Sequence, residues 1–288
     1  MNHWRMRLLF GFLIVSWSIA WPISKIGLQF MSPLWFTSAR LLVGTTTMMG
    51  FVLATKKFAI PKAQDLGLIL AVGLLQISCY ILLSSIGLSY LPAGQAALLA
   101  YTTPLWVMPI ATLIFREDTG LLKWAGFFLG MGGLFLLLCP WQLNWHDRHI
   151  IYGSLFLLLA SFSWGISIIC IRYMHWHKSP LELIPWQLLI GTIPVLLFTT
   201  FKEPFPMVTW NGSLILSLLY TGVLITGISY WGGVVVNKRL PAIMVSLGFL
   251  AVPVFSLLLS VTFLHETISL LMMLSMLSIL LGVTCVAL

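Results

Sequence analysis

Leu91-Pro92-Ala93 recurs as Leu240-Pro241-Ala242, which lies 149 residues further along the chain. Further residues recur at the same distance, in the pairs Gly73/Gly222, Pro104/Pro253, Glu117/Glu266 and Gly133/Gly282. An earlier motif, Ser32-Pro33-Leu34, recurs as Ser179-Pro180-Leu181 at a distance of 147 residues. Prolines, glycines and a glutamate that keep register over such a distance indicate that the chain is an internal duplication.

The composition is that of an integral membrane protein. Hydrophobic residues make up 60% of the chain, charged residues only 8%, and the mean hydropathy is +1.03, whereas a soluble protein carries roughly a quarter charged residues. A helix that crosses a bilayer needs about 20 apolar residues. The charge-poor runs predict ten such helices, at 8–27, 34–54, 66–88, 94–114, 121–139, 152–171, 181–201, 210–235, 242–264 and 269–288.

Ten spans in two copies give five spans per copy. Because five is odd, the second copy must enter the membrane inverted relative to the first. We therefore expect an all-α membrane protein of two inverted five-helix repeats, residues 1–145 and 146–288. The short loops leave no room for a soluble catalytic or nucleotide-binding domain. The first apolar run has no small-residue cleavage site after it, so we expect a retained helix rather than a signal peptide.

The positive charges predict the orientation. Three basic residues, Lys25, Arg148 and Lys202, fall on one side of the expected membrane, and eleven fall on the other. The eleven are Arg5, Arg7, Lys56, Lys57, Lys62, Arg116, Lys123, Arg172, Lys178, Lys238 and Arg239. The positive-inside rule then places both termini in the cytoplasm. This distribution explains the net charge of +8 without nucleic-acid binding, and we expect the chain in the plasma membrane, the inner membrane of a bacterium.

Arg40 is the one basic residue that falls inside a predicted span. A charge at that depth is costly, so Arg40 should face the bundle interior or a water-filled cavity. It could anchor a helix end by bonding to backbone carbonyls, or it could bind a substrate carboxylate, which suits a guanidinium. Gln187 occupies the equivalent position of the second copy.

Aromatic and amide side chains at mid-span predict a central chamber. Together with Arg40, the candidate substrate-binding residues are Trp21, Gln76, Tyr80, Tyr101, Trp164 and Tyr230. Trp21 and Trp164 occupy equivalent places in the two copies, and Gln95 and Gln187 could add polar groups. For any single aromatic, ordinary packing is the alternative, and Trp210 at a span end is better explained as an interfacial residue.

Pro104 and Pro253 are expected to kink their helices in mid-span, because each removes a backbone hydrogen bond. Matched kinks could serve gating, although a static kink is the alternative. Gly126 and Gly130 form a GxxxG pattern, which permits close helix packing, within the chain rather than between chains.

These features resemble the EamA domain of the drug/metabolite transporter superfamily, in two copies. The resemblance rests on Trp21, Ser32-Pro33-Leu34, Arg40, Leu91-Pro92-Ala93, Pro104 and Glu117, and it covers essentially the whole chain. It implies a ten-helix carrier that exports or imports amino acids, nucleobase derivatives or other metabolites.

We therefore expect a secondary transporter that moves small organic metabolites by alternating access. Amino acids or related amphipathic compounds are the favoured substrates, and export is favoured on the resemblance alone. A non-transporting assembly factor or sensor is the alternative. No catalytic motif, metal site or cofactor site is expected, and the chain should be a monomer or weak dimer. Every acidic residue lies at a span end or in a loop, which favours facilitated transport or exchange over proton coupling.

Overall fold

The computed structural model describes residues 3–138, 147–206, 208, 210–264 and 270–287. Eight helical stretches in this part of the chain are long and apolar enough to cross a membrane, and two shorter apolar helices, Leu121–Leu136 and Met273–Cys285, accompany them. The elements of the first five spans are α1 (His3–Gly27), α2 (Pro33–Ala54), η1 (Ala63–Asp65) with α3 (Leu66–Leu70), η2 (Ala71–Cys79) and α4 (Tyr80–Tyr90), α5 (Ala93–Ala100) with α6 (Pro104–Leu113), and α7 (Leu121–Leu138). Those of the second five are α8 (Arg148–Tyr173), α9 (Pro180–Lys202), α10 (Gly212–Leu219) with η4 (Tyr220–Ser229) and α11 (Tyr230–Arg239), α12 (Ala242–Gly248) with α13 (Ala251–Leu264), and α14 (Leu270–Ala287).

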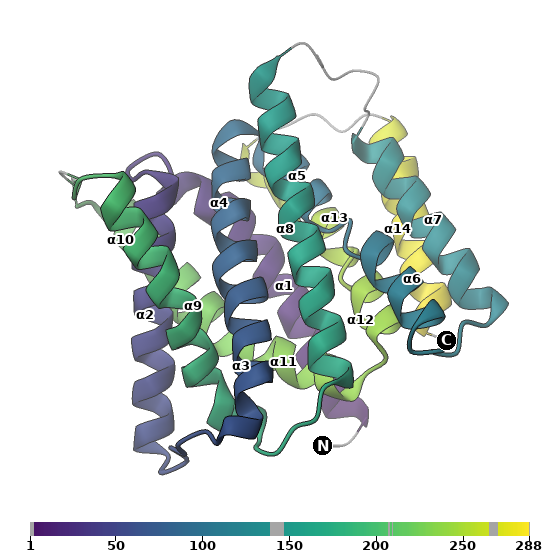
Figure 1. Ribbon diagram of the computed structural model, residues 1–288. Coiled ribbons are helices and arrows are strands. Elements are labelled where there is room, and N and C mark those ends of the chain that lie inside the picture. Colours follow the sequence, from purple (N-terminus) through teal and green to yellow (C-terminus); the bar gives the residue numbers. More distant parts are fainter. Residues whose placement is uncertain (1–2, 139–146, 207, 209, 265–269, 288) are drawn as a thin grey trace.

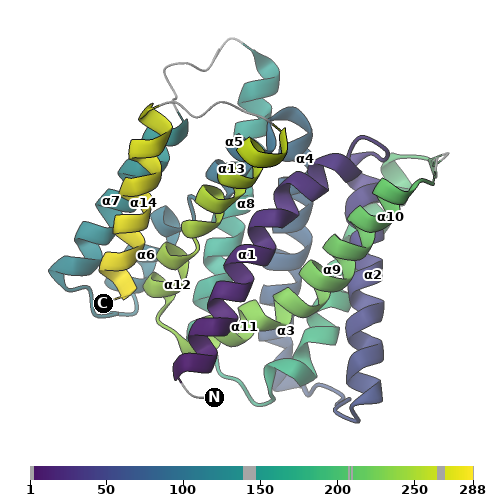
Figure 2. The same ribbon diagram turned by 180° about the vertical axis from the view of Figure 1, so that it is seen from behind.

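The two copies run in opposite directions through the bundle. In Figure 1, α1 rises from the lower end of the molecule, whereas α8 descends from the upper end, and both termini lie toward the lower side. Figure 2 shows the same arrangement from behind, with α7 and α14 packed together at one flank. The expected all-α fold of two inverted repeats is confirmed. The proposed boundary at 145/146 and Glu266 lie outside the described residues.

The repeated Ser-Pro-Leu motifs begin the second helix of each copy. Ser32 accepts a hydrogen bond from the backbone N–H of Trp35 at 3.3 Å, and Pro33 is the first residue of α2. Ser179 and Glu182 form a capping box before α9, with Pro180 as its first residue. Proline is favoured there because its missing N–H would have no helical partner.

Two glycine crossings hold the copies together. A Cβ on Gly44 of α2 would lie 2.9 Å from the carbonyl oxygen of Gly222 in η4, and a Cβ on Gly191 of α9 would lie 2.6 Å from that of Gly73 in η2. Each crossing therefore joins the second helix of one copy to the third span of the other, at backbone contact distance. Small residues allow helices to approach closely, and at these two positions even a Cβ would come within 3 Å of backbone oxygen.

The fourth and ninth spans are each broken into two helices. The first break lies at Tyr101–Thr103 and the second at Phe249–Leu250. The hydroxyl of Thr102 hydrogen-bonds Ser161 of α8 at 2.9 Å, and the hydroxyl of Ser18 on α1 donates to the carbonyl of Val252 at 3.1 Å. The first bond joins two side chains, and the second reaches a carbonyl in the first turn of α13. Both breaks are thus covered by neighbouring helices, and irregular backbone is tolerated at membrane depth only where protein covers it.

The breaks correct the expectation for the two prolines. Pro104 is the first residue of α6 and Pro253 is the third residue of α13, so neither kinks a continuous helix from its interior. The first turn of a helix lacks intrahelical partners for its N–H groups, and a proline there costs little. Each proline instead starts the second half of a broken span.

The third and eighth spans each contain a π-helical segment, η2 (Ala71–Cys79) and η4 (Tyr220–Ser229). The segments lie at the repeat distance from each other, so both copies share this irregularity. The GxxxG glycines pack within the chain, because a Cβ on Gly282 of α14 would lie 2.7 Å from the carbonyl oxygen of Gly126 and 2.6 Å from the amide nitrogen of Gly130.

Candidate functional site: a cavity between the repeats

A half-enclosed cavity lies between the two copies, with an empty volume of about 600 Å³ that includes its mouth. It is lined by Trp17, Ala20, Trp21, Ser24, Arg40, Gln76, Tyr80, Ile81, Ser84, Ser85, Leu88, Tyr101, Trp164, Ile225 and Tyr230. All seven candidate binding residues from the sequence are in this set. Gln95 and Gln187 are not.

Among the described residues, Arg40 is the only charged one in the lining. Its side chain is 9% exposed, and its Nε donates one hydrogen bond, to the hydroxyl of Thr226 in η4 at 3.3 Å. No carboxylate in the described part of the chain lies within salt-bridge distance of it. Arg40 is therefore not the helix-end anchor that was the alternative, and a buried guanidinium without an anion is a costly arrangement that a bound anion would relieve.

Trp164 lies at the centre of the aromatic cluster. Its ring centroid is 5.0 Å from that of Tyr80, 5.2 Å from that of Tyr101 and 5.6 Å from that of Trp17. The side chain is 2% exposed, and its indole N–H has no acceptor among the described residues. A buried N–H donor without an acceptor costs free energy. The cluster gives the cavity an aromatic wall on which a ligand can stack.

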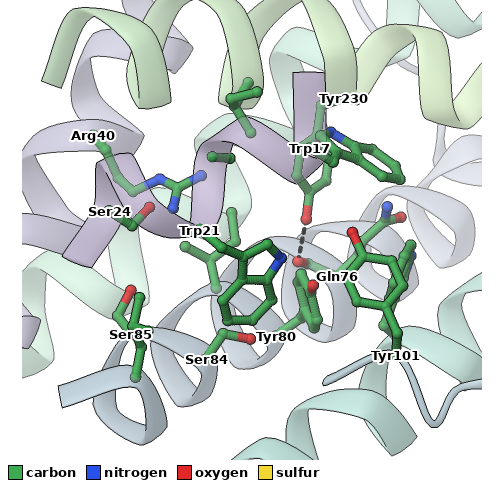
Figure 3. A pocket seen from close by; sticks show the side chains of 15 residues that line it. Trp17, Trp21, Ser24, Arg40, Gln76, Tyr80, Ser84, Ser85, Tyr101 and Tyr230 are labelled. Atoms are coloured by element: carbon green, nitrogen blue, oxygen red, sulfur yellow. Dashed lines mark hydrogen bonds between the residues drawn. The ribbon is translucent and has the colours of Figure 1, made fainter. Parts of the chain in front are cut away.

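Gln76 and Tyr230 connect the two π-helical spans within the lining of the cavity. The hydroxyl of Tyr230 donates to the backbone carbonyl of Gln76 at 2.5 Å, and the hydroxyl of Ser167 donates to the side-chain oxygen of Gln76 at 3.0 Å. Figure 3 shows the first of these bonds, which links the two copies directly. The amide nitrogen of Gln76 is left to face a ligand or solvent.

The cavity is polarised and reaches away from the chain termini. Figure 3 shows Arg40 and Ser24 at one end of the lining and Tyr101 at the other, with Trp21 between them. Ser24, Ser85 and Leu88 lie near the C-terminal ends of α1 and α4, at the upper end of the molecule in Figure 1. The site can therefore receive a ligand with an anionic group beside Arg40 and an apolar body against the aromatic rings.

Sequence reasoning missed the small polar residues of the lining. Ser24 lies three residues after Trp21, while Ser84 and Leu88 continue the four-residue spacing that begins at Gln76 and Tyr80. Extending each stripe along its helix face would have found them. Serine carries no hydrophobic or charge signal of its own in a span, so only this geometry identifies it.

The EamA-like transporter family matches residues 5–139 and 151–288. The chain belongs to this family. The Bacillus subtilis protein named uncharacterized transporter YoaV is 26% identical over 280 residues, which cover 96% of each chain. The Salmonella typhimurium probable amino-acid metabolite efflux pump is 27% identical over 274 residues, which cover 90% of this chain and 88% of the relative. The chain is thus a multi-pass membrane transporter and not an enzyme.

A crystal structure that is 20% identical in sequence has a TM-score of 0.80 and covers 99% of this chain and 98% of its own. At that identity the likeness shows the fold alone. The whole ten-span arrangement described above is therefore a known architecture.

Proposed function

We propose that the chain carries small amphipathic metabolites with an anionic group, amino acids foremost, across the bacterial inner membrane by alternating access between its two repeats. The observation that supports this substrate class is Arg40, a buried cation in the cavity without a carboxylate partner among the described residues. A substrate carboxylate would supply the missing charge. The adjoining aromatic rings would bind an apolar side chain.

Export is the direction that we favour, because one relative is named a probable amino-acid metabolite efflux pump. The cavity lining contains no aspartate or glutamate among the described residues. Proton-coupled carriers keep an ionisable carboxyl at depth, so facilitated transport or substrate exchange is the mode that fits this cavity.

The test is counterflow in liposomes that contain the purified protein. Vesicles loaded with one unlabelled amino acid at a time would be diluted into labelled tracer, across a panel of acidic, neutral and aromatic side chains. Arg40→Gln should weaken the binding of every active substrate about 10- to 150-fold and reduce counterflow accordingly, since a charge-assisted hydrogen bond contributes about 1.5–3 kcal/mol. Arg239→Gln is the control, because it removes an exposed cation at the end of α11.

Equal counterflow in the wild type and Arg40→Gln would refute the assigned role of the arginine. Absence of counterflow for the whole panel, with folded wild-type protein, would favour the alternative of a non-transporting assembly factor or sensor.

A further inference from the structure

Two buried amide side chains lie outside the cavity. Gln187 of α9 and Asn237 of α11 are both 0% exposed. Neither the amide nitrogen nor the amide oxygen of either side chain has a hydrogen-bond partner among the described residues. Such groups are rare in folded proteins, because each buried donor or acceptor without a partner is unfavourable. A partner outside the described residues, or a second conformation, must account for them.

Gln187 is the structural counterpart of Arg40. A Cβ on Gly73 would lie 2.9 Å from the backbone oxygen of Gln187, and a Cβ on Gly222 would lie 3.1 Å from that of Arg40. The two side chains therefore start from matching places at the two glycine crossings.

Their partners differ. The hydroxyl of Thr226 accepts the hydrogen bond of Arg40 at the first crossing, and the repeat distance of 149 residues places Ile77 at the matching point of the second. A Cβ on Gly44 would meet Thr226 at 2.5 Å, and a Cβ on Gly191 would meet Ile77 at 2.5 Å, which confirms the match. Isoleucine offers no acceptor, and Gln187 is left without one.

Asn237 is the counterpart of a lining residue as well. It lies 149 residues after Leu88, which lines the cavity near its mouth. The cavity thus has an inverted image in the other half of the molecule, and Gln187 and Asn237 hold the positions of Arg40 and Leu88 in that image.

The inverted image is filled by apolar side chains in this conformation. Ile81 and Tyr230, which also line the cavity, belong to a packed cluster with Leu183, Leu188 and Val234. Beyond this cluster, toward the termini, the guanidinium of Arg172 donates to the carbonyl of Lys238 at 3.0 Å, and the ammonium of Lys238 lies 4.5 Å from the ring centroid of Trp176. The molecule is closed on the side of its termini.

We infer that Gln187 and Asn237 line a second half-cavity, which is closed here and opens toward the terminus side in the opposite conformation. This inference rests on the proposed alternating access. In that conformation the two amides bind the substrate by hydrogen bonds from neutral groups, in place of the ion pair to Arg40. The substrate therefore faces a cation when the cavity opens away from the termini, and two amides when it opens toward them.

The inference is tested with Gln187→Met, which keeps the volume and removes the amide. Because the amide has no partner here, the midpoint of thermal unfolding should rise, while exchange in liposomes should fall about tenfold, since the opposite conformation loses its polar lining. Substrate binding to Arg40 should be unchanged. Thr37→Val is the matched control: it removes a fully buried hydroxyl of α2 that has no partner in the described chain and does not line the cavity. It should raise the midpoint without slowing exchange.

Asn237→Leu is a second variant with the same expected pattern, should Gln187→Met fail to fold. Unchanged exchange in both variants, or a lowered midpoint in the variant that folds, would overturn the inference.

An independent measurement is maleimide labelling of Gln187→Cys in a background without native cysteines. Labelling from the terminus side supports the second half-cavity, and its absence overturns it. If the wild-type protein neither binds nor exchanges any substrate, the proposed function fails, and this labelling still decides whether the half-cavity opens.

Discussion

Replacing Gly44 by alanine should disturb the cavity through the partner of Arg40. A Cβ at position 44 would lie 2.5 Å from Cγ2 of Thr226 and 2.9 Å from the carbonyl oxygen of Gly222. The second contact is with backbone, so α2 and η4 must separate by a few tenths of an ångström. Overpacking of this kind costs about 1–3 kcal/mol, and alanine returns about 1 kcal/mol of helix propensity. We expect a net loss of about 0–2 kcal/mol of stability.

Gly50→Ala on the same helix is the control, because a Cβ there meets nothing within 4 Å. It should leave the unfolding midpoint unchanged or raise it. Thermal unfolding of the purified variants, followed by intrinsic tryptophan fluorescence, measures both changes. Substrate binding should weaken in Gly44→Ala only, because Thr226 moves away from Arg40. If Gly44→Ala were as stable as Gly50→Ala and bound substrate as well as the wild type, the close crossing would not position the arginine.

Three further predictions concern the aromatic lining, the orientation and the energy source. Trp164→Ala and Tyr101→Ala should each weaken substrate binding, by about 0.5–1.5 kcal/mol for every aromatic ring that no longer stacks on the ligand. Trp210→Ala is the control and should leave binding unchanged, because Trp210 is 62% exposed. Equal binding in all three variants would mean that the cavity is not the site. Cysteines at Lys57 and Arg148 should be labelled from opposite sides of the membrane, the former from the cytoplasm, and labelling from one side would contradict the inverted topology. A pH gradient alone should not drive substrate accumulation in liposomes, and accumulation against the substrate gradient would show proton coupling.

The span count and the cavity lining were predictable because both rest on strong sequence signals. Long apolar runs mark the spans, and Arg40 and the mid-span aromatics are costly or bulky enough to require a specific place. The helix breaks were not predictable in the same way. Gly248 precedes the second break, and Pro104 and Pro253 follow the two breaks. Prolines also lie inside unbroken helices, as Pro22 does in α1 and Pro194 in α9, so a single proline does not tell a broken span from a continuous one.

The π-helical segments escaped prediction for a related reason. Hydrophobic periodicity distinguishes a helix from a strand, and in an amphipathic helix a wider turn would change the spacing of the polar residues. A fully apolar run such as Leu66–Leu75 has no polar residues whose spacing could change. The glycine repeats Gly73 and Gly222 indicated that these places matter. They did not indicate that the helices widen there, at the close crossings with α9 and α2.

The two widened segments also bear on how the protein tolerates changes in length. A π turn takes in one residue more than an α turn while the helix on either side continues. Losing a residue within Ala71–Cys79 could therefore be absorbed by tightening the turn, with the flanking faces of α3 and α4 still directed at their present neighbours. The same loss in the uninterrupted α2 would rotate everything beyond it by about 100°. Natural insertions and deletions among relatives should accordingly collect in these two segments, at the centre of the membrane, where spans otherwise accept them least.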